Sequence, residues 1–239
     1  MRGLTKIGEA AAVIIGRRKG YLREAMYPHN LPMTVLGAGL LWFGWFGFNA
    51  GSALSAGTLS AMAFVATHTS AVSATLIWVI IEWIHRGKPT MFGAATGSIA
   101  GLATITPAAG FVSPMSSLII GLAAGAVCYG ALNMKSRLGY DDSLDAFGVH
   151  GIGGALGTLA TGLFAQTLIN PSGGNGLFFG AQKLFVSQMI AILITAAYSF
   201  IVSVIILKIL DKVIGLRIDE ESEVSGLDIS QHGETGYTF

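Results

Sequence analysis

The chain has 239 residues, of which 52% are hydrophobic and only 11% are charged. Soluble globular domains carry roughly 25% charged residues, so this composition indicates an integral membrane protein. Fourteen Lys and Arg residues against thirteen Asp and Glu residues give a formal net charge of +1, and nucleic acid is therefore not an expected partner. The single cysteine, Cys128, excludes an internal disulfide framework and a cysteine-based metal site.

Six apolar stretches are candidates for helices that cross the ~30 Å hydrocarbon core of a bilayer. They cover residues 31–56, 59–82, 91–105, 114–134, 142–166 and 185–210, and the third is short enough to suit a tilted or thinned passage. Residues 10–16 are apolar but too short to cross, like the end of a helix. The sequence therefore predicts an all-α polytopic membrane protein with a short N-terminal helix stub and about six transmembrane helices.

We divide the chain into a helix stub with a basic loop (residues 1–30), a transmembrane domain (31–210) and a tail (211–239). The basic residues fall on one side of the predicted spans: Arg17, Arg18, Lys19, Arg23, Arg86, Lys88, Lys135, Arg137, Lys208, Lys212 and Arg217. The other side carries Lys183 alone. Because short cytoplasmic loops collect Lys and Arg, the basic loop and the tail are both predicted to be cytoplasmic, which an even number of spans requires.

Glycine spacing predicts how the helices meet. Four pairs are separated by four residues: Gly47 and Gly51, Gly97 and Gly101, Gly121 and Gly125, and Gly153 and Gly157. This spacing lets helix backbones approach closely in lipid, so we expect a compact bundle. The tail, by contrast, holds an acidic cluster between residues 219 and 223, and its composition alone favours a solvated, disordered segment.

An aromatic stripe runs along the first predicted span. Leu41, Trp45, Phe48 and Ser52 follow one another at helical spacing and share one face, while Gly44, Gly47 and Gly51 lie on another face and allow close packing. An aromatic ring near the outer mouth of this span can hold a small cation by its negative face, with the Ser52 hydroxyl accepting a hydrogen bond from it. The alternative is that these rings pack in the core or face lipid.

His150 is the strongest single candidate for chemistry. Asp141 or Asp142 can cap the fifth predicted helix, and Asp145 adds negative charge to its first turn. A helix counted from Asp141 rises about 13 Å by His150, near the bilayer centre, where an ionisable residue usually faces a cavity and a neutral imidazole is expected. The alternative is a buried histidine that hydrogen-bonds to a neighbouring helix.

The other histidines give no metal signature. His68 is expected to form a hydrogen bond between helices, and no histidine pairs with another at helical spacing. We therefore expect neither a metal nor a cofactor.

Five groups of residues resemble the ammonium transporter (Amt/Mep/Rh) family and occur in the order found there. They are residues 28–33, 44–52, the pair 87–89 and 106–108, residues 141–151, and residues 226–234. The resemblance extends from about Gly16 to the C-terminus. It implies a trimer of eleven-helix protomers in the plasma or inner membrane, each with a narrow apolar pore between two inverted five-helix repeats. This chain would supply the second repeat and the final helix.

The resemblance also implies a role for each candidate residue. Phe48 matches a pore gate, Ser52 part of an outer ammonium site and Trp45 a neighbour of that site. Leu41 and Ala146 match the apolar pore lining, and His150 matches the second of two hydrogen-bonded pore histidines. In the family, ammonium is thought to arrive as a cation and to lose its proton, so that neutral ammonia crosses the constriction.

The resemblance begins inside the family's fifth helix, and residues 1–6 do not match. The first pore histidine, a second gate phenylalanine and an outer-site tryptophan have no counterpart here. We therefore expect a truncated or split transporter chain that needs a separate first half and takes up no ammonium alone. The tail motif implies a trimeric PII-type signalling protein as a cytoplasmic partner.

Two alternatives come from other function classes. One is a non-conducting sensor or regulatory subunit, although the tail is too short for a folded signalling domain. The other is an intramembrane serine protease using Ser52 and His150, which a separation beyond hydrogen-bond reach would exclude.

Overall fold

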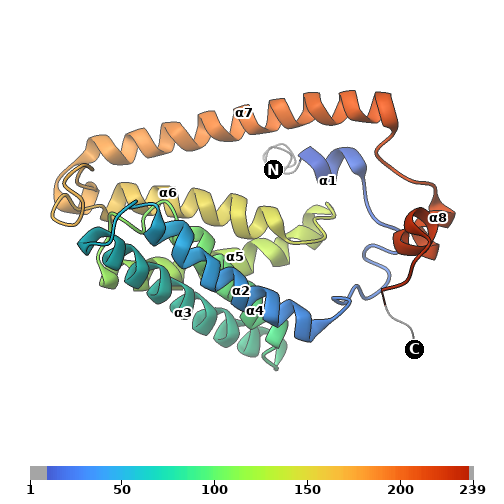
Figure 1. Ribbon diagram of the computed structural model, residues 1–239, viewed down its shortest axis with the longest axis horizontal. Coiled ribbons are helices and arrows are strands. Elements are labelled where there is room, and N and C mark those ends of the chain that lie inside the picture. The colour runs from blue at the N-terminus through green and yellow to red at the C-terminus, as the bar shows by residue number, and fades with distance from the viewer. Residues whose placement is uncertain (1–9, 237–239) are drawn as a thin grey trace. The chain divides into compact units, whose positions relative to one another are not determined.

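The computed structural model describes residues 10–236, which form helices and connecting segments without any strand (Figure 1). Five helices are long and apolar enough to cross a membrane, and one shorter apolar helix accompanies them. The prediction of an all-α polytopic membrane protein is therefore confirmed.

Six elements carry most of the apolar sequence. They are α2 (Leu31–Gly51), α3 (Thr58–Arg86), α4 (Met91–Ile105), α5 (Pro114–Leu138), α6 (Gly153–Phe164), which continues the π-helical turn η2 (Phe147–Ile152), and α7 (Gln182–Ile214). Four short elements complete the chain: α1 (Ala10–Ile15), the 3-10 turn η3 (Leu177–Phe179), α8 (Glu220–Ser225) and the π-helical turn η4 (Asp228–His232). The short third span has the predicted bounds, and α1 confirms the helix stub.

The helix ends follow from local chemistry. The Asn30 side chain accepts a hydrogen bond of 2.9 Å from the Met33 N–H and caps α2, with Pro32 in the first turn, where its missing N–H leaves no bond unmade. Gly87 ends α3 in the left-handed conformation at φ 78°. Thr90 caps α4 by accepting a hydrogen bond of 2.9 Å from the Gly93 N–H.

The chain divides into two compact units, which we describe separately. The membrane-helix unit comprises residues 28–134 and 143–195, and so contains α2, α3, α4, η2, α6, most of α5 and the first part of α7. The tail unit comprises the described parts of residues 1–27, 135–142 and 196–239.

Glycines set the closest contacts within the membrane-helix unit. On α4, Gly97 faces Trp78, and a Cβ at Gly101 would lie 2.6 Å from the Ser70 carbonyl oxygen of α3. Gly121 and Gly125 of α5 face α3 in the same way, and Gly153 and Gly157 face Thr104 of α4. Three of the four predicted glycine pairs therefore bring helices into backbone contact, as the spacing indicated.

The fourth pair behaves differently. A Cβ added at Gly44, Gly47 or Gly51 of α2 would meet nothing within 4 Å in the described chain. The prediction of close packing at this face is wrong for this chain, because no helix of residues 10–236 covers it. α2 nevertheless packs against α3 and α4 through other residues.

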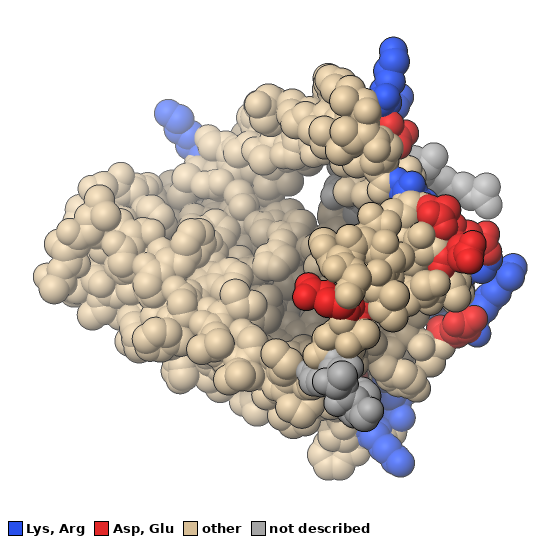
Figure 2. All heavy atoms as spheres, turned by 45° about the vertical axis from the view of Figure 1, so that its right-hand side comes forward, with Lys and Arg blue, Asp and Glu red and all other residues tan. Residues whose placement is uncertain are grey.

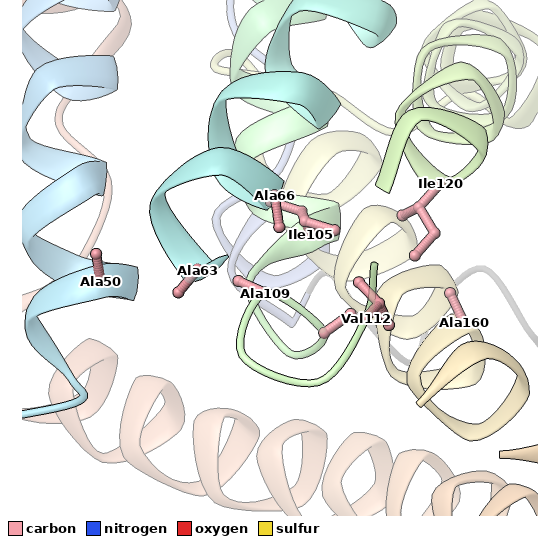
Figure 3. Packing of buried hydrophobic residues seen from close by; sticks show 9 residues of the cluster. Ala50, Ala63, Ala66, Ile105, Ala109, Val112, Ile120 and Ala160 are labelled. Atoms are coloured by element: carbon pink, nitrogen blue, oxygen red, sulfur yellow. The ribbon is translucent and has the colours of Figure 1, made fainter. Parts of the chain in front are cut away.

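The main apolar core is built from small side chains. Its members come from α2, α3, α5, α6 and the segment that ends α4 and leads to α5, and Figure 3 shows eight of them labelled: Ala50, Ala63, Ala66, Ile105, Ala109, Val112, Ile120 and Ala160. Alanines need little space between helices and lose no side-chain entropy on burial. This core, rather than large interdigitating side chains, positions α2 beside α3 and α4.

Charged contacts organise the tail unit. Arg217 donates hydrogen bonds of 2.6 Å to Glu223 and 3.0 Å to the Ile15 carbonyl, and the Lys19 N–H donates one of 2.8 Å to Glu223. Asp219 caps α8 by accepting a hydrogen bond of 2.8 Å from the Ser222 N–H. Figure 2 shows acidic side chains next to basic ones at several places on the surface. The expectation of a disordered tail is therefore wrong for residues 211–236, because these ion pairs order it.

Candidate functional site

The aromatic stripe of α2 is present as predicted. Leu41 and Phe48 are 53% and 60% exposed, and Trp45 is partly buried between them along the helix. Ser52 is the C-terminal cap of α2, and its hydroxyl donates a hydrogen bond of 2.5 Å to the Phe48 carbonyl. That bond uses the only proton of the hydroxyl and leaves its lone pairs directed elsewhere.

Trp45 connects the stripe to two other helices. Its ring lies parallel to the His150 imidazole, with 6.3 Å between centroids and 8° between planes. Phe48 meets the indole edge-on, at 6.2 Å and 88°. The indole N–H donates a hydrogen bond of 2.7 Å to the Thr106 hydroxyl, which itself donates to the Leu102 carbonyl at 2.8 Å. The plane of Trp45 is thereby fixed from α4 while its faces remain available to His150.

His150 lies within η2, one turn of π-helix that α6 continues and that begins the fifth of the six apolar helices. Single π-helical turns inside α-helices are frequent at functional sites because they redirect side chains. Gly151 permits the tight turn, since a Cβ there would lie 2.5 Å from the Phe147 ring. His150 is exposed in the chain as described and has contacts beyond the Trp45 ring.

The depth argument for His150 needs correction. Residues 141–145 are not helical, and helical structure begins at Ala146, so the rise cannot be counted from Asp141. Trp45 supplies a better reference, because it lies fourteen residues beyond Leu31 in α2, or roughly 21 Å along that helix. Its stacked partner His150 therefore lies well inside the length of α2.

The predicted helix caps also differ. Ala146 holds the N-cap position of η2, which neither Asp141 nor Asp142 occupies. The Asp142 carbonyl accepts a hydrogen bond from the Lys135 ammonium at 2.8 Å. Asp145 precedes the helix at φ 55°, and its carbonyl accepts the Val149 N–H at 3.1 Å, which places it next to the first turn rather than in it.

Asp141 binds Arg18 instead. Its carboxylate accepts hydrogen bonds of 2.8, 2.9 and 2.7 Å from the Arg18 N–H and guanidinium. Burial raises the pKa of the Asp141 carboxyl, but the hydrogen bonds and charge of Arg18, with the charge of Lys135, outweigh burial and hold that pKa below its usual value. A charge partner 123 residues away could not be read from sequence order.

Three residues near the stripe were not singled out from the sequence. Thr106 fixes Trp45, and Asn49 donates a hydrogen bond of 3.0 Å to Thr67 between α2 and α3. A usable signal existed for Thr106, because a partly buried indole N–H requires an acceptor.

His68 also differs from expectation. Among residues 10–236 it forms no hydrogen bond, and it packs against the rings of Trp42 and Phe46 at 5.5 and 6.0 Å. It therefore links α3 to α2 through its ring, and the predicted hydrogen bond between helices is wrong.

The arrangement does not fit a serine nucleophile. The Ser52 hydroxyl bonds to the Phe48 carbonyl, and within the described residues it makes no hydrogen bond to His150. A hydrolase needs its base within hydrogen-bond reach of the nucleophile, so this geometry does not favour the protease alternative. The arrangement instead suits a small cation at the aromatic faces beside a group that exchanges a proton.

Comparisons with known proteins found similar sequences and solved structures. Residues 6–237 match the family model described as Ammonium Transporter Family. The chain is 50% identical over 231 residues to an ammonium transporter of Bacillus subtilis, covering 96% of this chain and 57% of that protein. The crystal structure of Saccharomyces cerevisiae Mep2 matches with a TM-score of 0.82 at 35% identity, covering 90% of this chain and 50% of that one.

A structure titled Sensor Amt Protein also matches, with a TM-score of 0.83 at 30% identity over 95% of this chain and 56% of that one. The chain thus spans about half the length of the relatives it matches. These relatives are transporters and a sensor rather than enzymes. The extent of the family match and the identity over nearly the whole chain show that this protein belongs to the ammonium transporter family.

Proposed function

We propose that the chain forms one wall of a pore for ammonium and ammonia transport, with His150 as its proton-exchanging group. Phe48 and Ser52 receive the substrate at the outer mouth, and Trp45 holds His150 beside the aromatic stripe of α2. Leu41 and Ala146 supply apolar pore lining. Asp141, Asp142 and Asp145 take no part in conduction.

The physical argument starts from the cost of charge. An isolated cation is unfavourable in the bilayer centre by at least about 2.5–3.5 kcal/mol, so a bare ammonium ion does not cross an apolar pore easily. An aromatic face offsets part of that cost at the mouth, by about 0.5–2 kcal/mol. A neutral imidazole farther in can then accept a proton or pass it on, leaving ammonia without a charge.

The single observation that carries the proposal is the parallel contact between the rings of Trp45 and His150. It places the imidazole against the helix that bears Phe48 and Ser52, although the two segments are about a hundred residues apart. A second observation supports a shared pore. The glycine face of α2 is open in the described chain, and a neighbouring protein segment can pack there.

Ammonium uptake by cells that lack their own transporters tests this proposal. The chain is produced alone and together with the part of the Bacillus subtilis ammonium transporter that it does not match. We expect uptake from the pair and only background uptake from the chain alone. His150→Ala should reduce uptake by the pair at least tenfold. His232→Ala, a change of an exposed tail histidine, should leave uptake unchanged.

The outcomes separate cleanly when both parts are present in the membrane at equal amounts. Background uptake from the pair contradicts the transport proposal. Uptake from the chain alone at the level of the pair contradicts the shared pore. Unchanged uptake in His150→Ala contradicts the role of the imidazole.

A sensor function is the second candidate, favoured by the likeness to the Sensor Amt structure and by the ordered tail. A sensor responds to ammonium by changing the exposure of residues 219–236 to protease without net uptake. Uptake that proceeds with unchanged tail cleavage excludes this function.

The assembly and partners are further proposals. We propose a homotrimer in the plasma or inner membrane, or a complex with a separate first half, with the C-terminus in the cytoplasm. A PII-type signalling protein binds the cytoplasmic face through the tail. Co-purification of such a protein that survives deletion of residues 219–239 would remove the tail from this interaction.

A further inference from the structure

The tail unit contains a cavity of about 470 Å³ formed by the segments 17–23 and 217–223. Five basic side chains line it, together with two acidic ones: Arg17, Arg18, Lys19, Arg23, Arg217, Glu220 and Glu223. Its size falls within the range of roughly 300–1,000 Å³ that small-molecule sites occupy. Its lining carries an excess of positive charge.

Three of the five basic side chains already have acidic partners. Arg18 binds Asp141, Lys19 pairs with Glu220, and Arg217 pairs with Glu223. The Lys19–Glu220 pair, with the hydrogen bond from the Lys19 N–H to Glu223, joins the two segments that line the cavity. The charges of the three pairs largely cancel.

The other two basic residues lack such partners. The Arg17 Nε donates a hydrogen bond of 2.7 Å to the Gly139 carbonyl, and its terminal nitrogens contact no carboxylate of residues 10–236. The Arg23 side chain makes no ion pair or hydrogen bond with any residue between 10 and 236, and only its backbone N–H is bonded, to the Gly20 carbonyl at 2.9 Å. Two guanidinium groups in one cavity therefore have no acidic partner within the described part of the chain.

We propose that this cavity binds a phosphate group between Arg17 and Arg23. Two guanidinium groups match the charge of a phosphate dianion, and their planar donors suit its oxygens in bidentate geometry. The same chemistry is offered by a soluble phosphorylated compound and by the headgroup of an anionic lipid. The proposal is independent of transport, since it involves only residues of the tail unit.

The lining also predicts which substitution should raise the affinity of the cavity for phosphate. Glu220 neutralises Lys19 and adds negative charge to the cavity. Removing that charge frees Lys19 to contact the bound phosphate. Glu220→Gln should therefore strengthen binding, while changes at either arginine weaken it.

Calorimetric titration of the full chain in an uncharged detergent with inorganic pyrophosphate tests the site. We expect saturable binding that weakens at least tenfold in Arg17→Gln and in Arg23→Gln, and tightens severalfold in Glu220→Gln. Arg137→Gln is the matched control, because Arg137 is an exposed arginine of the same unit that does not line the cavity. Its affinity should equal that of the unmodified chain.

The unliganded melting temperature of each variant shows that weaker binding does not come from unfolding. Absence of saturable binding overturns the proposal. So does an equal loss in Arg137→Gln, because general charge would then explain the affinity. Tighter binding in Glu220→Gln cannot arise from damage to the fold and supports the site directly.

Native mass spectrometry with phosphatidic acid distinguishes the two sources. Lipid adducts that disappear in both arginine variants and persist in Arg137→Gln identify a lipid headgroup as the ligand. Adducts that are the same in all variants, combined with selective pyrophosphate binding, identify a soluble phosphate compound. Adducts and pyrophosphate binding that are both insensitive to Arg17 and Arg23 overturn the site.

Discussion

Each of the two units of this protein is stabilised internally by a different kind of contact. In the membrane-helix unit, Gly97 and Gly101 bring α4 against α3, and the core is dominated by alanine. In the tail unit, Arg18, Lys19 and Arg217 each bind an acidic partner. Lipid offers helices no hydrophobic driving force to associate, so close backbone packing must do it. Water weakens each exposed ion pair, so the tail needs several.

The largest expected effect comes from breaking a backbone contact in the membrane-helix unit. In Gly101→Ala, the new Cβ would lie 2.6 Å from both the Ser70 carbonyl oxygen and the Ala74 Cβ, so α3 and α4 must separate. Such overpacking costs about 1–3 kcal/mol in unfolding free energy. The Ser70 oxygen belongs to the backbone of α3, so no side-chain rotation can relieve this contact. Thermal unfolding in detergent, followed by tryptophan fluorescence, measures the loss.

Gly44→Ala is the matched control on the open face of α2, where a Cβ meets nothing within 4 Å. Alanine in an exposed helix position is more favourable than glycine, so this variant should be up to about 1 kcal/mol more stable. Equal melting temperatures for the two variants would contradict the packing difference between these helix faces.

The next effect concerns a charge that lies within the membrane-helix unit. Glu82 is 4% exposed, and its carboxylate accepts hydrogen bonds of 3.0 Å from the Thr90 N–H and 3.0–3.1 Å from the Thr90 hydroxyl. Glu82→Ala leaves these donors at the start of α4 without an acceptor and should cost about 1–3 kcal/mol in unfolding free energy. Glu82→Gln retains one acceptor oxygen and should lose less. An alanine variant as stable as the glutamine variant would show that the hydrogen bonds contribute nothing.

The same contrast explains what the sequence could predict. The bounds of α4, the helical register of Trp45 and Phe48, and the contacts of Gly97, Gly101, Gly121 and Gly125 follow from local composition and spacing. Helices in lipid are long, regular and apolar, so a local pattern determines most of their structure. The open glycine face of α2 could not be predicted, because spacing does not say which neighbour is present.

Polar contacts between residues far apart in the sequence could not be predicted in this way. Asp141 lies before a helix and has the residue type of an N-cap, but the Arg18 guanidinium binds it from 123 positions away. The tail has the composition of a disordered segment, yet Glu223 joins it to Lys19 and Arg217. Ion pairs carry no periodic signal, so only the folded chain identifies them.

A smaller effect is expected from the ion pair between Asp141 and Arg18 in the tail unit. The Asp141 side chain is 1% exposed and that of Arg18 is 43% exposed, so water partly screens the pair. Asp141→Asn should cost about 1–2 kcal/mol at neutral pH, below the roughly 3–5 kcal/mol for breaking a fully buried pair. Unfolding measured against pH tests this value and its cause.

The sign of the pH dependence follows from the lowered pKa of Asp141. Its stabilising effect is complete above the unfolded-state pKa of about 3.9 and is lost as the pH falls through the lower folded-state pKa. The difference between the unmodified chain and Asp141→Asn should therefore shrink below about pH 4. A difference that stays constant down to pH 2 would contradict a charged Asp141 in the folded state.

The smallest effect is expected where the tail meets the basic loop. Glu223→Gln weakens two contacts at once, the hydrogen bond from the Lys19 N–H and the ion pair with Arg217, which together lower the pKa of Glu223. Exposed ion pairs contribute about 0.2–1 kcal/mol, so the unfolding temperature should hardly change, while cleavage of the tail by protease should rise up to about fivefold.

Glu221→Gln is the control. It changes a neighbouring exposed glutamate of α8 that forms no ion pair within the described residues, and the rate of tail cleavage should stay the same. Added salt should narrow the gap between the unmodified chain and Glu223→Gln, because screening weakens the same contact that the substitution removes. Identical cleavage of all three proteins at low salt would mean that backbone contacts, rather than charge, hold the tail.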